Sequence, residues 1–182
     1  LFIKEKINNS EKLIGHIRAT KHHFVDDICY NNTHPFWFRD NYWVHNGSVY
    51  PFNNYFFKKF ISAKYLEHIK GKTDSELLFY IFLSINDKET SILNSWKIFF
   101  KLLYKFYYEN NIVISANIVF CNKQVLLISR FINNNEEPPS LYIDTNLNIV
   151  SSEPISNNYN IIERNKSIIV NINSNTKNIE NL

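Results

Sequence analysis

The hydrophobic period of the chain changes twice, and this pattern restricts the fold more than any other feature. Between Thr73 and Asn110 the apolar residues recur at helical spacing, with a 4-3-4-3 stripe that runs from Ile92 to Phe106. On either side of this region, short apolar and aromatic runs are separated by polar turns, which is typical of strands. Strands, then two helices, then strands predict an α+β fold built in layers.

The boundaries follow from turn and capping residues. Thr73 and Ser91 are expected to open the two helices, and Asn122 with Lys123 predicts a tight hairpin. The Asn-rich stretches at 133–135 and from Asn173 onward are interpreted as loops. Residues 55–69 fit either short helices or a loop. Strands are expected over 13–19, 36–38, 42–44, 112–121, 124–131, 140–144, 147–152, 160–163 and 167–172.

Length and composition exclude several classes of protein. A chain of 182 residues fits a single domain over residues 1–182 and can bury a core. The net charge of +3, with 20 scattered Lys and Arg, argues against a nucleic-acid partner. No apolar run reaches about 18 residues, so no membrane span is expected. Cys29 and Cys121 form no disulfide framework, which favours a reduced, cytoplasmic setting.

Glycine is scarce, so its positions are informative. The chain has 3 Gly, and two of them, Gly15 and Gly47, lie in conspicuous segments. A backbone needs Gly where φ is positive or where another group approaches closely. Asn46 and Gly47 stand between an aromatic run at 41–44 and an apolar run at 48–52. This Asn-Gly pair therefore predicts a hairpin turn.

Five short motifs, taken together, resemble a known family. In this order and at this spacing they resemble the class II glutamine amidotransferases, which are N-terminal nucleophile (Ntn) hydrolases. The resemblance is greatest to the compact branch of the YafJ-like proteins, the glutathione-degrading amidotransferase subunit and the ergothioneine-pathway amidohydrolase. It spans about residues 13–172 and implies a four-layer αββα sandwich. The motifs are His-Ile-Arg-Ala-Thr at 16–20, Thr-His-Pro-Phe at 33–36, His-Asn-Gly at 45–47, Thr-Asp-Ser-Glu at 73–76 and Ser-Ser-Glu-Pro-Ile at 151–155.

The resemblance implies how the ends of a glutamine substrate are bound. Arg18 would pair with the α-carboxylate, because a guanidinium group binds a carboxylate through two parallel hydrogen bonds. Asp74 would bind the α-ammonium group. Each residue also has a simpler interpretation. Arg18 fits a surface ion pair, and Asp74 complements the helix dipole next to a capping box formed by Thr73 and Glu76.

The reacting amide requires different groups. Asn46 and Gly47 are candidate oxyanion-hole residues, since a side-chain amide and a backbone N–H can converge on one oxygen. Without the neighbouring motifs, an ordinary turn would explain both residues. His34 and His45 are interpreted as structural residues beneath the pocket, and His45 is also counted among the substrate contacts. The spacing of His and Cys matches no standard zinc pattern, so we expect no metal and no cofactor.

The chain departs from the family at its beginning. The family nucleophile is a Cys at the mature N-terminus, followed by a Gly-rich segment, whereas this chain begins at Leu1. Cys29 and Cys121 match no family position and have no free α-amine to act as base. We therefore expect an N-terminally truncated domain whose nucleophile is encoded upstream of Leu1. Residues 1–182 alone are expected to be inactive.

Three hypotheses of different classes follow. The first is an amidohydrolase that cleaves glutamine or a γ-glutamyl compound through a cysteinyl thioester, with ammonia released or passed to a separate subunit. The second is a catalytically inactive relative that binds a γ-glutamyl ligand or a partner protein. The third is a structural domain without a ligand.

Overall fold

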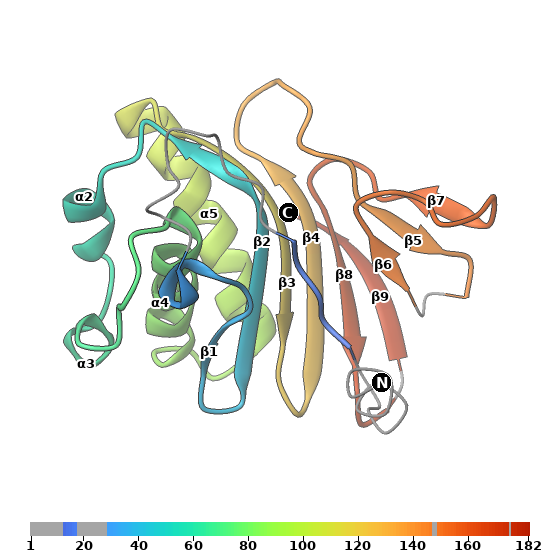
Figure 1. Ribbon diagram of the computed structural model, residues 1–182, viewed down its shortest axis with the longest axis horizontal. Coiled ribbons are helices and arrows are strands. Elements are labelled where there is room, and N and C mark those ends of the chain that lie inside the picture. Colours follow the sequence, from blue (N-terminus) through green and yellow to red (C-terminus); the bar gives the residue numbers. More distant parts are fainter. Residues whose placement is uncertain (1–12, 18–28, 147–148, 175) are drawn as a thin grey trace.

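The computed structural model describes residues 13–17, 29–146, 149–174 and 176–182. A six-stranded antiparallel sheet stands at its centre, with two long helices on one side and a three-stranded sheet on the other (Figure 1). The elements, in chain order, are η2 (Tyr30–Asn32), β1 (Phe36–Phe38), β2 (Asn41–Tyr50), α2 (Asn54–Lys58), α3 (Ala63–Leu66), α4 (Asp74–Asn86), α5 (Ile92–Asn110), β3 (Val113–Cys121), β4 (Val125–Ile132), β5 (Tyr142–Asp144), β6 (Val150–Ser151), β7 (Tyr159–Ile161), β8 (Lys166–Asn171) and β9 (Thr176–Asn181).

The layers confirm the predicted α+β class. The large sheet has the strand order β1-β2-β3-β4-β8-β9, and the small sheet has the order β6-β5-β7. Helices α4 and α5 form a layer beside β2 and β3, and the small sheet lies beyond β8 and β9 (Figure 1). The described residues therefore form one helical layer and two sheet layers, which are three of the four layers of the expected αββα sandwich.

The main core lies between the large sheet and the helices. The predicted stripe of α5 is confirmed, since Trp96, Phe99, Leu103 and Phe106 are all buried. Trp43 of β2 packs in the same core, with its ring centroid 5.7 Å from that of Phe82 and 5.8 Å from that of Phe99. Helix α4 is buried from Ser75 to Ser84, because it is enclosed by α5, the short helices and the sheet.

A smaller core joins the two sheets. It contains Ile128 and Ile168 of the large sheet together with Ile143 of the small sheet. The Arg130 side chain reinforces this contact, although it is only 7% exposed. Its guanidinium group donates to the carbonyls of Pro138, Pro139 and Ile162, and to the Glu137 carboxylate. These acceptors satisfy a charge that would otherwise be costly to bury.

Several predicted elements need correction. Residues 13–17 carry no strand, and the rest of the expected strand at 18–19 lies outside the described residues. The strand expected at 160–163 is β7, which spans Tyr159–Ile161 and belongs to the small sheet. The interpretation of the tail as a loop was wrong, because Thr176–Asn181 forms β9 and pairs with β8. The region 55–69 resolves into the short helices α2 and α3.

The predicted hairpin at Asn46 and Gly47 is also wrong. Strand β2 runs unbroken through both residues, which pair with Asn117 and Ala116 of β3. None of the glycines has a positive φ. Gly47 is required for the other reason, close approach, since a Cβ atom there would overlap the carbonyl group of Ser115.

The hairpin predicted at Asn122 is confirmed. The Asn122 side-chain oxygen accepts hydrogen bonds from the backbone N–H groups of Gln124 and Val125, at 2.8 Å and 2.9 Å. These bonds turn the chain from β3 into β4, which pair as antiparallel neighbours. A short polar side chain that bonds to the backbone two residues on is the reason why Asn favours such turns.

The close approach at Gly47 gives a stability prediction. The variant Gly47→Ala should lower the free energy of unfolding by about 1–3 kcal/mol, because the β3 backbone must move to admit a methyl group. Gly15→Ala is the matched control, since a Cβ atom there meets nothing within 4 Å and little change is expected. Urea denaturation of both variants measures the difference. Equal stability of the two would contradict the close contact between β2 and β3 at Gly47.

Asn133 lies in a loop after β4, as expected, but its side chain braces the core and the residue is only 3% exposed. Its side-chain N–H₂ group donates to the carbonyls of Leu103 and Ile112, at 2.8 Å and 2.9 Å. Its side-chain oxygen accepts from the backbone N–H of Ile114 at 2.8 Å. One side chain therefore connects α5 to the beginning of β3.

Removing the side-chain hydrogen bonds of Asn133 should lower the stability of the protein. Asn133→Ala removes the side-chain partner of the buried Ile112 carbonyl and Ile114 N–H, together with a second bond to the Leu103 carbonyl of α5, and the free energy of unfolding should fall by about 2–4 kcal/mol. Asn135→Ala, two residues away and exposed, is the control and should change stability by less than about 0.5 kcal/mol. Thermal and urea unfolding measure both. A loss confined to Asn135→Ala, or absent from both, would refute the role of Asn133.

Candidate functional site

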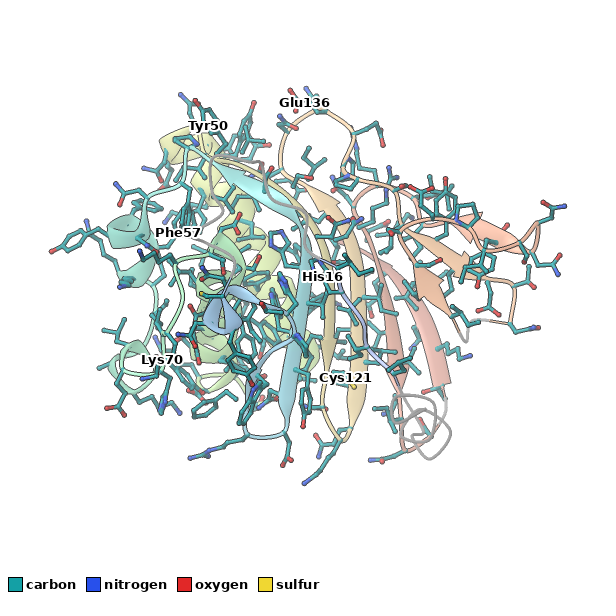
Figure 2. All side chains as sticks on the ribbon, viewed as in Figure 1. His16, Tyr50, Phe57, Lys70, Cys121 and Glu136 are labelled. Atoms are coloured by element: carbon teal, nitrogen blue, oxygen red, sulfur yellow. The ribbon has the colours of Figure 1, made fainter. Side chains whose placement is uncertain are left out.

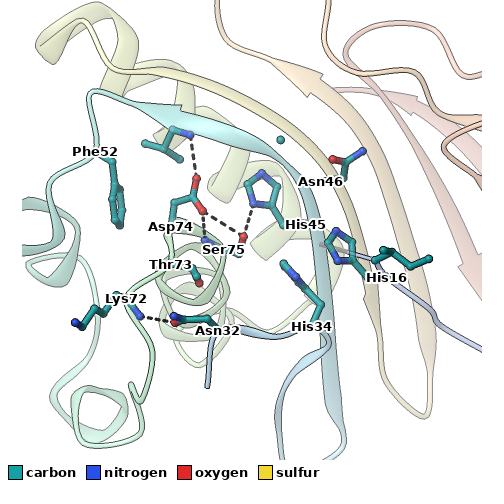
Figure 3. Close-up of a pocket in the computed structure, with 13 residues that line it drawn as sticks. His16, Asn32, His34, His45, Asn46, Phe52, Lys72, Thr73, Asp74 and Ser75 are labelled. Carbon is teal, nitrogen blue, oxygen red and sulfur yellow. Dashed lines mark hydrogen bonds between the residues drawn. The ribbon is translucent and has the colours of Figure 1, made fainter. Parts of the chain in front are cut away.

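The candidate site lies along one edge of β2. Strand β1 pairs only with residues 41–43 of β2, and no other described strand pairs with the remainder of that edge. A cavity of about 460 Å³ opens there, between β2 and the first turn of α4 (Figure 3). Its described walls are His16, Ile17, Asn32, His34, His45, Asn46, Gly47, Val49, Phe52, Lys72, Thr73, Asp74 and Ser75.

The beginning of α4 is fixed by its own capping residues. The Thr73 side chain accepts from the backbone N–H of Glu76 at 3.2 Å, as the predicted capping box requires. The Glu76 carboxylate does not complete that box, because it accepts from the backbone N–H groups of Lys70 and Gly71, each at 2.8 Å. Burial raises the pKa of Glu76, and these two N–H groups offset part of the rise.

The segment before α4 is held against the segment that precedes β1. The backbone N–H of Lys72 donates to the Asn32 side chain at 2.9 Å. Gly71 packs so closely here that a Cβ atom would overlap the Asn31 carbonyl and the Asn32 side chain. This brace was not predicted. The available signal was Gly71 itself, the third glycine of a chain that has only 3.

Asp74 presents a fixed carboxylate to the cavity. Its Oδ2 atom accepts from the backbone N–H of Val49 at 3.0 Å, and its Oδ1 atom accepts from the N–H of Ser75 at 2.7 Å. A carboxylate has about four acceptor sites, so acceptor capacity remains for a ligand. The arrangement suits a cationic group such as an ammonium ion.

Gly47 presents a backbone donor to the same cavity. The N–H of Val49 points away from β3 toward Asp74, and N–H groups two residues apart on a strand point the same way. The N–H of Gly47 is therefore directed to the open edge of β2. The side chain of Asn46 lies on the opposite face of the strand from that of His45 (Figure 3). It borders both this cavity and a second one of about 490 Å³ on that face.

His45 supports the cavity from below and is only 2% exposed. Its Nδ1 atom lies 2.8 Å from Ser75 Oγ, and its Nε2 atom lies 3.2 Å from the carbonyl oxygen of Ser115. Both ring nitrogens are thus engaged within the protein, which fits the structural interpretation of His45 better than direct contact with a substrate. His34 packs nearby, with its ring centroid 4.1 Å from that of His16.

The cavity brings together Asp74, Asn46, Gly47 and His45, four of the five residues proposed from sequence. The fifth, Arg18, lies outside the described residues. Neither cysteine is among the described residues that line the cavity. Cys29 is exposed, and Cys121 is buried at the end of β3, at the opposite end of the sheet from Tyr50 (Figure 2).

Two negative findings concern the part of the chain that the structure describes. Its residues contain no group of three or more His, Cys, Asp or Glu placed to hold a metal ion. None of its helices combines the length and apolar character needed to cross a membrane.

Comparison with solved structures places the fold. A glutamine aminotransferase class-II domain protein from Silicibacter pomeroyi superposes with a TM-score of 0.66 at 19% identity, covering 82% of this chain and 71% of its own. The glutamine phosphoribosylpyrophosphate amidotransferase of B. subtilis gives a TM-score of 0.63 at 15% identity, covering 91% of this chain and 34% of its own. At these identities the likeness shows the fold alone.

Sequence comparison identifies the family. The probable glutamine amidotransferase DUG3 of Saccharomyces cerevisiae is 33% identical over 81 residues, which are 43% of this chain. The match spans only 22% of the length of the yeast protein. The family model described as glutamine amidotransferases class-II matches residues 2–139. Because that match covers well over half of the chain, the chain belongs to the class II glutamine amidotransferases.

Proposed function

We propose that the full-length protein cleaves the side-chain amide of glutamine or of a γ-glutamyl compound through a cysteinyl thioester. The observation that carries this proposal is the pairing of two groups in one cavity. The Asp74 carboxylate is fixed on one wall, and the edge of β2 at Gly47 forms another. An amino acid whose α-ammonium group is bound at Asp74 would direct its side chain toward that edge.

The anchors orient the substrate before the reaction. Asp74 binds the α-ammonium group, and Arg18 binds the α-carboxylate as the family resemblance implies. Two charge-assisted contacts at one end of a flexible molecule restrict where its amide can lie.

The chemical step needs an oxyanion hole and a nucleophile. The thiolate attacks the carboxamide carbon, and the negative charge that develops on oxygen is stabilised by the Gly47 N–H and the Asn46 side-chain amide. The C–N bond then breaks, and ammonia or an amine leaves with the proton that the α-amine of the nucleophilic Cys took from its thiol. Water hydrolyses the thioester and releases glutamate. The ammonia is either released or passed to a separate subunit, in a cytoplasmic setting.

The nucleophile is proposed to be a Cys encoded upstream of Leu1. Neither cysteine of the chain lines the described part of the cavity, and Cys121 is at the far end of its strand. The same observation favours the alternative, a catalytically inactive relative that binds a γ-glutamyl ligand or a partner protein. The coding sequence upstream of Leu1 separates the two, since the enzyme requires a Met-Cys start and the inactive relative does not.

The role of Asp74 is tested in the full-length protein. Asp74→Ala should lower kcat/KM for glutamine by tens to several hundred fold, because losing a charge-assisted pair costs about 2–4 kcal/mol. Arg18→Ala should act in the same way. Asp40→Ala is the control, since Asp40 is exposed and paired with Lys123 far along the sheet. Release of glutamate, measured for glutamine and for a γ-glutamyl dipeptide, also identifies the better substrate. Unchanged kcat/KM in Asp74→Ala would remove Asp74 from the site.

Asn46 should act at a different stage. Asn46→Ala should reduce kcat by about 10²–10³-fold with a smaller change in KM, because the oxyanion exists only in the transition state. Ser48→Ala, on the same face of β2 and exposed, is the matched control and should keep kcat. Steady-state kinetics of both variants give the two constants separately. A change confined to KM would mean that Asn46 contacts only the ground-state amide.

A further inference from the structure

Two hydrogen bonds join β2 to the first turn of α4, and Gly47 lies midway between them. His45 Nδ1 lies 2.8 Å from Ser75 Oγ, and the Val49 N–H donates to Asp74 Oδ2 at 3.0 Å. His45 lies two residues before Gly47 and Val49 two residues after it, so their side chains lie on the same face of the strand. These two bonds therefore set the position of Asp74 relative to the Gly47 N–H.

The chemistry of the acceptors fixes one proton of this network and limits where the others can be. The carbonyl of Ser115 can only accept, so His45 Nε2 carries a proton and donates to it. In a neutral imidazole the Nδ1 atom then has a lone pair, which accepts the hydroxyl proton of Ser75. A hydroxyl group has a single proton. With a neutral His45 this proton goes to Nδ1 at 2.8 Å, in place of the longer bond of 3.3 Å that the Ser75 hydroxyl can donate to Asp74 Oδ1.

This proton arrangement matters for Asp74. If the Ser75 hydroxyl pointed to Oδ1, it would use acceptor capacity that a cationic ligand needs. With the hydroxyl turned to His45, the 3.3 Å bond from Ser75 Oγ is not made, and Oδ1 accepts the backbone N–H of Ser75 at 2.7 Å. The carboxylate keeps the negative charge exposed toward the cavity, where Asp74 is half-buried.

We infer that Ser75 is a positioning residue of the substrate site. Its hydroxyl donates to His45, which ties the first turn of α4 to β2 and β3, and the same bond leaves Asp74 Oδ1 available to an ammonium group. Ser75 itself, 5% exposed, contributes through His45 and Asp74. The part that concerns the ligand rests on the proposed function. The part that concerns the proton arrangement does not.

The test uses the full-length protein and two readouts. Nitrogen-15 NMR of the His45 ring, assigned by its loss in His45→Gln, reports the protonation and hydrogen bonding of each nitrogen. Calorimetry with L-glutamate reports ligand binding, because glutamate carries the same α-ammonium group as glutamine and is not consumed.

The variants are Ser75→Ala, which removes the hydroxyl, and Ser75→Thr, which keeps one. Ser84→Ala is the control, since it removes a buried, hydrogen-bonded hydroxyl from the same helix.

In the wild type at neutral pH, we expect His45 Nε2 to carry a proton. The Nδ1 resonance should be that of an unprotonated nitrogen whose lone pair accepts a hydrogen bond. Ser75→Ala should move the Nδ1 resonance to that of an unbonded lone pair and weaken glutamate binding by about three- to tenfold. Ser75→Thr should restore both readouts. Ser84→Ala should lower thermal stability without changing either readout.

Three results would overturn the inference. A wild-type His45 protonated on both nitrogens would place the Ser75 hydroxyl on Asp74 instead. An unchanged Nδ1 resonance in Ser75→Ala would show that the bond does not form. A shifted resonance with unchanged glutamate binding would show that the bond does not position Asp74. Failure of the wild type to bind glutamate would instead overturn the proposed function, and the NMR readout would still decide the proton arrangement.

Discussion

The pairing of β2 with β3 is the constraint on which the rest of the structure depends. The ladder is continuous from Tyr42 opposite Cys121 to Tyr50 opposite Val113, so one edge of β2 is fully used. The other edge is paired with β1 only at its beginning. Its remaining N–H groups need partners, because an unpaired buried backbone group is costly. The Asp74 carboxylate satisfies the one at Val49, and the cavity lies beside the others.

Aromatic packing in the core fixes the position of α4 relative to β2, and the contact between Asp74 and the Val49 N–H requires that position. Trp43 extends from β2 into the helical layer and packs on Phe82 of α4 and Phe99 of α5. Trp96 donates to Ser167 Oγ at 2.7 Å, and Ser167 Oγ donates to the Ile128 carbonyl at 2.8 Å, which connects α5 to β8 and β4. Protein interiors are packed as densely as organic crystals, so such contacts leave little freedom for α4 to slide. The precision of the site is therefore supplied by the core beneath it.

The site combines a helix N-terminus with a strand edge. The first turn of α4 supplies a carboxylate oriented by backbone N–H groups, and β2 supplies backbone donors that need no side-chain movement. Groups fixed in this way cost little reorganisation when charge develops on a substrate. Membership of the class II glutamine amidotransferases rests on the sequence match over residues 2–139, and the fold agrees with it. The roles proposed for Asp74, Asn46 and Gly47 are argued from the chemistry of the cavity.

The sequence by itself determined the two long helices, the hairpin at Asn122 and the grouping of Asp74 with Asn46 and Gly47, because apolar period, capping residues and motif order are properties of short segments. Only the tertiary structure decided that Asn46 and Gly47 continue a strand. Glycine is needed at position 47 because the Ser115 carbonyl of β3 leaves no room for a Cβ atom, and not because the chain turns there. It also decided that the polar tail forms β9. The residue pattern of the tail does not indicate a strand, and the strand forms because the tail pairs with β8. The bonds of Asn133 and of His45 with Ser75 join residues far apart in sequence. Strand register and such long-range bonds depend on which segments meet in space, and no local pattern encodes that.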